Sequence, residues 1–227
     1  MQRENYLDPV AIRHQNDFVF RTFVWMIAGL LVTAITAALT YMTGLYIAVL
    51  TGVTYMTLAV AELVVVFVFS LLFNKLSPAV VGALFFTYAV INGLVFSVIF
   101  AVYQLSSIVL LFLAGAALFG GFALYGHSCK KDLTRFGPML MITLLVAIVV
   151  SLINIFLLKS STMEIFIDCA VLFLFFGVTA YDMNRIRQFS MMALESDRKL
   201  YIYGAMQLYL DFINIFLRLL ALFGKQK

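Results

Sequence analysis

Seven long apolar segments constrain this chain more than any other feature of its sequence. They cover residues 23–42, 46–73, 79–103, 107–126, 139–158, 162–181 and 205–223. Each approaches or exceeds the roughly 20 residues that an α-helix needs to cross a bilayer, and none shows the period-two alternation of a barrel strand. Only 11% of the residues are charged and 64% are hydrophobic, which excludes a water-soluble globule. We therefore predict an all-α polytopic membrane protein with seven transmembrane helices in a single bundle.

Proline and glycine residues add detail to these segments. Pro78 and Pro138 fit the first position of a helix, where the missing N–H has no intrahelical acceptor to lose, so they should mark the starts of the third and fifth helices. Small residues in the fourth segment, Gly115, Gly120 and Gly121, are expected to let neighbouring helices approach closely.

The basic residues predict the orientation in the membrane. Most Lys and Arg residues fall on one side, in the N-terminal segment and in the second, fourth and sixth connections. The other side holds only Lys159, Lys225 and Lys227, and Arg218 lies within the last segment. The positive-inside rule then places the N-terminus in the cytosol and, after seven spans, the C-terminus outside.

These boundaries divide the chain into three parts. We predict a cytosolic N-terminal tail over residues 1–21, a transmembrane domain over residues 22–224 and a short C-terminal tail over residues 225–227. Cys129 and Cys169 should lie on opposite sides of the membrane, so no disulfide is expected between them.

Ionisable side chains inside the spans are the candidate functional residues. A charge at bilayer depth costs roughly 2.5–3.5 kcal/mol on the insertion scale, so it needs a partner, water or a function. Five residues qualify: Glu62 in the second span, Asp168 and Asp182 on the sixth, and Asp211 and Arg218 on the seventh.

The acids away from the sixth connection have separate interpretations. Glu62 has no basic residue within one or two helical turns, so it is either a neutral acid hydrogen-bonded across helices or a residue lining a pore. Asp168 follows Glu164 by one turn at the outer end of its helix, where both are expected to be solvated charges at an entrance.

Asp182 and Asp211 flank the sixth connection and should lie in the same layer of the membrane. Two carboxyl groups close together in a low dielectric cannot both ionise cheaply, so the pair should hold one proton around neutral or mildly acidic pH. That arrangement would make a pH sensor. Equally open is a separate partner for each acid, with Arg185 three residues after Asp182 and Arg218 seven after Asp211 on common helix faces.

Three strings in the chain resemble the signatures of the Bax inhibitor-1 family, also called the transmembrane Bax inhibitor motif family. They are Tyr-Asp-Met-Asn-Arg-Ile at residues 181–186, Leu-Tyr-Leu-Asp-Phe-Ile-Asn-Ile-Phe at residues 208–216, and Gly-His-Ser-Cys-Lys-Lys-Asp-Leu at residues 126–133. The likeness extends over nearly the whole chain, and the compact length is similar to the bacterial branch. The bacterial cytoplasmic (inner) membrane is therefore the expected location.

The resemblance implies a seven-helix bundle with its last helix near the centre and a pH-sensitive calcium leak. By position, Asp182 and Asp211 would be the family's aspartate sensor and gate. A basic residue at the cytosolic end of the second helix can latch onto the first of these acids in the family. Here Lys75 is the candidate latch, with Arg185 as the other nearby base, and lysine lacks the bidentate fork of arginine.

Calcium is expected as a permeant ion rather than as a resident cofactor, and no cofactor is predicted. Asp182, Asp211 and Glu62 would supply transient oxygen ligands, and Asn214 and Arg218 would line the pore with Glu62. The expected partners are the lipid bilayer, calcium ions and protons, without nucleic acid.

Three other functions stay open. Bacterial relatives in the family include a modulator of a membrane-bound protease, so a role as a membrane-protein partner is the main alternative. A proton-coupled transporter would also use buried carboxyl groups. An intramembrane aspartyl protease needs Gly-x-Gly-Asp at its second aspartate, whereas this chain has Tyr209-Leu210-Asp211, so we do not expect an enzyme.

Overall fold

The computed structural model describes residues 9–129, 131–192 and 198–227, and these residues fold into helices joined by short connections. The helices are α1 (Pro9–Met42), α2 (Tyr46–Leu50), α3 (Gly52–Leu72), α4 (Pro78–Val102), α5 (Leu105–Ser128), α6 (Gly137–Ile153), α7 (Ser161–Met192) and α8 (Arg198–Phe223), with a 3-10 turn η1 (Thr134–Phe136) and a π-helical turn η2 (Asn154–Leu158). Seven helical stretches among the described residues are long and apolar enough to cross a membrane. The predicted all-α polytopic membrane fold is confirmed.

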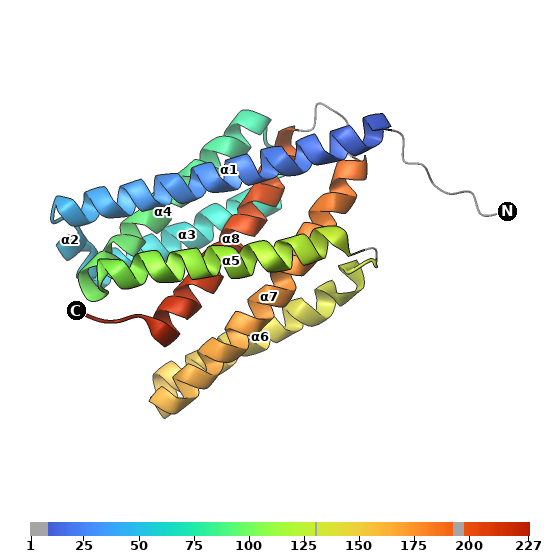
Figure 1. Cartoon of the computed structure of the whole chain (residues 1–227). Helices are drawn as coiled ribbons and strands as arrows, with labels where there is room; N and C mark the ends of the chain where they lie inside the picture. Colours follow the sequence, from blue (N-terminus) through green and yellow to red (C-terminus); the bar gives the residue numbers. More distant parts are fainter. Residues whose placement is uncertain (1–8, 130, 193–197) are drawn as a thin grey trace.

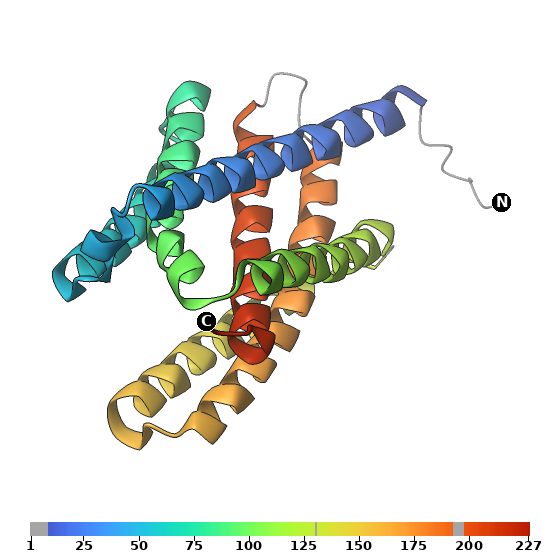
Figure 2. The same ribbon diagram turned by 60° about the vertical axis from the view of Figure 1, so that its left-hand side comes forward.

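Helix α8 lies at the centre of the bundle, as expected from the family resemblance. It packs against α1, α4, α5 and α7 (Figure 1). Leu208, Tyr209 and Ile215 on this helix are fully buried. By contrast, α3 packs mainly on α2 and α4, and α6 mainly on α7, so these two helices lie at the edges of the bundle (Figure 2).

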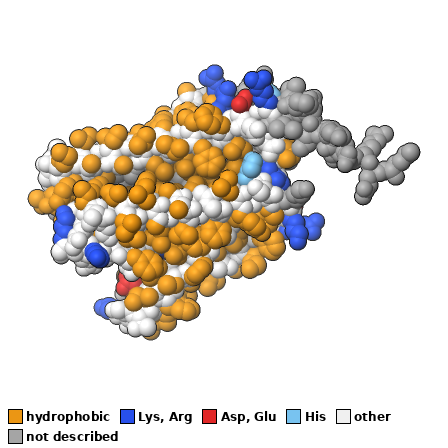
Figure 3. Space-filling model, viewed as in Figure 1, with side chains coloured by type: hydrophobic (Ala, Val, Ile, Leu, Met, Phe, Trp, Pro, Cys, Tyr) orange, Lys and Arg blue, Asp and Glu red, His pale blue; other side chains and the backbone are white. Residues whose placement is uncertain are grey.

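The surface suits a bilayer. Hydrophobic side chains cover the face formed by α1 and α5, and the Lys and Arg side chains visible there lie towards the two ends (Figure 3). Because successive spans alternate in direction, the start of α1 and the C-terminus lie at opposite ends of the bundle (Figure 1). The C-terminal residues are hydrogen-bonded to the connection between α4 and α5. Gln104 N donates to Lys225 O (2.9 Å), and Lys227 N donates to Val102 O (3.0 Å).

Several helices extend beyond the apolar segments that predicted them. Helix α1 begins at Pro9, so the predicted tail is helical from that residue, and residues 1–8 lie outside the described part. Helix α7 continues to Met192 and α8 begins at Arg198. Intrahelical hydrogen bonds also form outside the hydrocarbon core, so hydropathy marks the edge of the membrane and not the end of a helix.

The second apolar segment contains a break that the sequence analysis missed. Thr51 has an extended backbone (φ −66°, ψ 129°) and separates the single turn of α2 from α3. The starts predicted from proline are confirmed. Pro78 occupies the first turn of α4 after Ser77, whose side chain accepts from Val80 N (3.4 Å), and Pro138 occupies the first turn of α6.

The prediction that Gly115, Gly120 and Gly121 allow close helix packing is only partly correct. A Cβ on Gly115 would contact Leu219 of α8 at 3.5 Å, whereas one on Gly120 or Gly121 would meet nothing within 4 Å. The tightest approach of α5 is instead at Gly126, where a Cβ would lie 2.2 Å from the Ala180 carbonyl oxygen of α7. Both cysteines are free, as expected.

Candidate functional site

The structure brings Asp182 of α7 and Asp211 of α8 together. Both side chains are buried, with relative exposures of 6% and 3%. Their carboxyl groups lie within hydrogen-bonding reach of each other. The two residues that sequence and resemblance assigned to a sensor therefore form one buried pair between neighbouring antiparallel helices.

Three uncharged side chains surround this pair, and the sequence analysis missed all of them. When the Gln207 amide is oriented with its nitrogen towards Asp182, the nitrogen donates to both Asp182 carboxylate oxygens (3.1 and 3.2 Å), and the amide oxygen accepts from the Tyr203 hydroxyl (3.1 Å). Thr179, whose hydroxyl donates to Phe175 O (2.8 Å), lies close to Asp211. Gln207 and Tyr203 precede Asp211 by four and eight residues, and this helical spacing was the available signal.

Among the described residues, no cation lies within 4.0 Å of the carboxyl group of Asp182 or Asp211. The ion pair that these residues do contain joins Arg218 to Asp168. Arg185 is the base that acts on Asp182 through space, and its guanidinium lies over the Phe189 ring at 5.1 Å. Lys75 is exposed in the turn after α3 and makes no ion pair with Asp182. In this conformation neither candidate latch is closed on the aspartate.

Arg218 pairs with Asp168 instead of Asp211. Its Nη1 donates to Asp168 Oδ1 at 2.5 Å, and Asp168 is only 6% exposed. Asp168 is therefore a buried ion-pair partner, which corrects the expectation of a solvated entrance charge. The reason lies in the antiparallel packing of α7 and α8, which sets residues before Asp182 opposite residues after Asp211.

A polar pocket surrounds this ion pair at the end of the bundle away from the α7–α8 connection. It is lined by α6, η2, α7 and α8 and includes Lys159, Glu164, Asp168 and Arg218. A second, mostly apolar pocket adjoins it and includes Asn214 together with Arg218. The predicted entrance residues and two of the predicted pore residues thus lie along one side of α8.

Glu62 lies elsewhere, on α3. Its Oε1 is buried and has no hydrogen-bond partner. Its charge acts on Tyr88 of α4 and Tyr209 of α8, and the Tyr209 hydroxyl is hydrogen-bonded to Thr33 of α1 (2.7 Å). Within the described residues no three His, Cys, Asp or Glu side chains are grouped to hold a metal ion. Glu62, Asp182 and Asp211, which we predicted as transient calcium ligands, are therefore not grouped at one site.

Asn184 joins the aspartate helix to the connection between α5 and α6. Its Nδ2 donates to the carbonyl oxygens of Gly126 (3.2 Å), Cys129 (3.2 Å) and Lys131 (3.3 Å), and its Oδ1 accepts from Leu133 N (3.1 Å). Asn184 is fully buried. Two of the sequence strings that carry the family resemblance therefore meet at one side chain.

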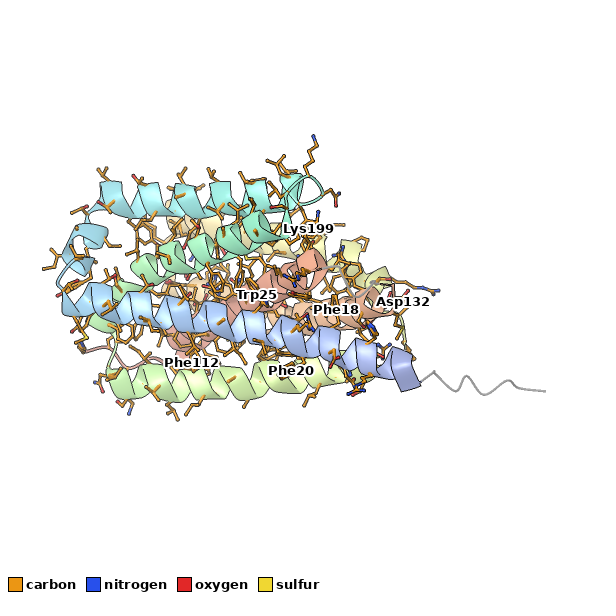
Figure 4. All side chains as sticks on the ribbon, turned by 90° about the horizontal axis from the view of Figure 1, so that it is seen from above. Phe18, Phe20, Trp25, Phe112, Asp132 and Lys199 are labelled. Carbon is orange, nitrogen blue, oxygen red and sulfur yellow. The ribbon has the colours of Figure 1, made fainter. Side chains whose placement is uncertain are left out.

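Neighbouring polar groups extend this contact. Arg187 donates to His127 O (2.7 Å), and Gln188 donates to Asp132 Oδ1 (2.9 Å), at the end of the bundle from which α1 starts (Figure 4). Hydrogen bonds from the Thr134 side chain, from Gln188 and from the Thr134 backbone lower the pKa of Asp132 to about 2. The connection is thus held against α7 two residues beyond Asp182.

The chain is similar to known bacterial proteins over almost its whole length. Residues 15–227 match the family model described as Inhibitor of apoptosis-promoting Bax1. Inner membrane protein YbhL of Escherichia coli (strain K12) is 37% identical over 216 residues, which is 92% of each chain. A protein of Deinococcus radiodurans is 37% identical over 224 residues, covering 97% of this chain and 93% of its own. The chain therefore belongs to the Bax inhibitor-1 family.

Proposed function

We propose that this protein is a pH-sensitive calcium leak in a bacterial inner membrane, gated by the protonation of Asp182 and Asp211. The observation that carries the proposal is the buried contact between the two carboxyl groups. The location is supported by the seven apolar helices and by the name of the Escherichia coli relative. The excess of basic residues on one side supports a cytosolic N-terminus and an outer C-terminus.

The gating follows from charge in a low dielectric. Two ionised carboxylates in contact, without a cation within 4.0 Å, would repel each other strongly. One shared proton lets one acid donate a hydrogen bond to the other and stabilises the contact between α7 and α8. A change in proton occupancy therefore shifts the balance between a closed conformation and an open one.

Calcium is the ion that the chemistry favours as a passing ligand. Carboxylate oxygens are hard ligands that Ca²⁺ prefers, and Asp182 and Asp211 supply them from one buried pair. Two acids, rather than a dense ring of them, favour a slow leak over a high-throughput channel. We propose no resident cofactor and no catalytic role for the pair.

The test is calcium uptake into proteoliposomes that contain the purified full-length protein. We expect uptake above that of empty liposomes, with a rate that depends on pH between 6 and 8 and is altered in Asp182→Asn and Asp211→Asn. Asp17→Asn removes an exposed acid from α1 and should behave as the wild type. No uptake at any pH would refute the leak and favour the role of a membrane-protein partner.

A further inference from the structure

The polar pocket at the outer end of α7 and α8 has features of a ligand site. Among the residues that line it are six with hydroxyl or charged groups: Ser151, Lys159, Ser161, Glu164, Asp168 and Arg218. Lys159 lies in the turn between η2 and α7 with a left-handed backbone (φ 48°). That turn joins two membrane-spanning stretches, so the pocket lies at the depth of lipid headgroups.

The pocket contains donors that the protein itself does not satisfy. Asp168 accepts one hydrogen bond from Arg218 Nη1, and the Arg218 side chain, which lines the pocket, is 34% exposed, so its guanidinium can reach a ligand there. Lys159 is exposed, and its ammonium group makes no ion pair with the described acids. Two cations with free donor capacity and two nearby serine hydroxyls suit a phosphate group.

One acid in the same pocket is also free. Asp168 is neutralised by Arg218, whereas the exposed Glu164 has no basic partner among the described residues. The charges of Arg218 and Asp168 cancel, and so do those of Lys159 and Glu164. The pocket therefore carries no net charge. Such a pair of unmatched opposite charges favours a zwitterion over a purely anionic ligand.

An apolar groove continues from this pocket into the membrane. The adjoining pocket shares Ser151 and Arg218 with it and is lined by Leu144, Ala147, Ile148, Val171 and Phe175 of α6 and α7. Ile148 is 49% exposed, so the groove opens toward the lipid-facing side of α6. A charged head beside an apolar groove matches the shape of a phospholipid.

We propose that this site binds a zwitterionic phospholipid with a primary amine, a phosphatidylethanolamine. The phosphodiester lies between Lys159 and Arg218, the ammonium group pairs with Glu164, and one acyl chain follows the groove between α6 and α7. The proposal does not depend on calcium conduction, because it rests on the outer pocket and not on the Asp182–Asp211 pair.

Native mass spectrometry of the full-length protein in detergent tests the site. The probes are dioleoyl phosphatidylethanolamine, dioleoyl phosphatidylglycerol and inorganic phosphate. We expect the ethanolamine lipid to bind the wild type most tightly. Lys159→Gln and Glu164→Gln should each weaken that binding about tenfold, as the loss of one charge-assisted contact implies. Both residues are exposed, so neither substitution disturbs the packed core.

Two further variants sharpen the result. Lys225→Gln removes an exposed cation from the same end of the bundle but outside the pocket, and it should leave lipid binding unchanged. Ser151→Leu fills the junction of pocket and groove and should block the lipid. Equal weakening by Lys159→Gln and Lys225→Gln would overturn the site. So would tighter binding of phosphatidylglycerol, or phosphate binding at the pocket without any preference among lipids.

Discussion

The ion pair between Asp168 and Arg218 shows how a single residue's surroundings change its role. Asp168 is buried, and its charge is compensated by one guanidinium. Removing one partner of such a pair leaves a buried charge unpaired, which is destabilising. Replacing both partners by apolar residues of similar size leaves no unpaired charge.

We therefore expect Arg218→Leu to lower the free energy of unfolding by about 3 kcal/mol. The double variant Asp168→Leu/Arg218→Leu should recover most of that loss. Thermal unfolding in detergent checks both. A double variant that is less stable than Arg218→Leu would contradict this view of the pair.

Asp132 provides a prediction outside the membrane. Its pKa is lowered from 3.8 to about 2, chiefly by the Thr134 side chain and then by Gln188. A lowered pKa in the folded state means that the ionised form stabilises the fold above about pH 4, and that this contribution is lost as the pH falls towards 2. The wild type should therefore exceed Asp132→Asn in melting temperature at pH 5 but not at pH 2. An equal difference in melting temperature at pH 5 and at pH 2 would show that the charge of Asp132 does not contribute to stability.

At this scale the sequence predicted the acids better than their partners. Asp182 and Asp211 stood out because a charge in a span is costly and needs an explanation. Gln207 and Tyr203 are uncharged, so no such cost drew attention to them. The spacing of Arg218 on its own helix suggested Asp211, but spacing within one helix does not give the register between two helices.

At the scale of helices, the contact between α5 and α7 depends on Gly126. A Cβ there would lie 2.2 Å from a backbone oxygen that cannot move aside without shifting the helix. Gly126→Ala should destabilise the protein by about 1–3 kcal/mol. Gly120→Ala, on the same helix but in open space, should be neutral or stabilising by up to about 1 kcal/mol. Thermal unfolding of the two variants side by side gives the comparison, and equal effects would refute the close packing.

The contact between Asn184 and the α5–α6 connection is a second property of paired elements. Asn184→Ala leaves three carbonyl oxygens and one N–H without their side-chain partner, which we expect to cost about 2 kcal/mol. Hydrogen exchange should accelerate at Leu133, whose amide donates to Asn184. Arg187→Ala removes a bond to the same connection at His127 O but none to Leu133, so it should change exchange at Leu133 less than Asn184→Ala does. Unchanged exchange at Leu133 in Asn184→Ala would argue that Asn184 does not hold the α5–α6 connection in place.

The apolar pattern predicted that each spanning helix exists but not where it ends. Charged and polar residues continue α1, α7 and α8 past the hydrocarbon core. The break at Thr51 also escaped prediction, because threonine and glycine are both tolerated inside apolar helices.

At the scale of the whole molecule, burial and hydropathy run in opposite directions. Among the seven spans, α8 is the least apolar and the most buried, whereas the span containing α6 is the most apolar and among the least buried. A helix surrounded by other helices meets no lipid, so it can carry Asp211, Asn214 and Arg218. Hydropathy alone could not place α8 at the centre, and that expectation came from the family resemblance.

The central claim is that Asp182 and Asp211 act as one unit that senses protons. The most direct test is a double-mutant cycle on the ratio of calcium uptake at pH 6 to that at pH 8, using Asp182→Asn, Asp211→Asn and the double variant. If the pair shares one proton, all three variants should show the same altered ratio, because either substitution alone destroys the unit. Single variants that each keep the wild-type ratio, or whose effects add independently in the double variant, would contradict the claim.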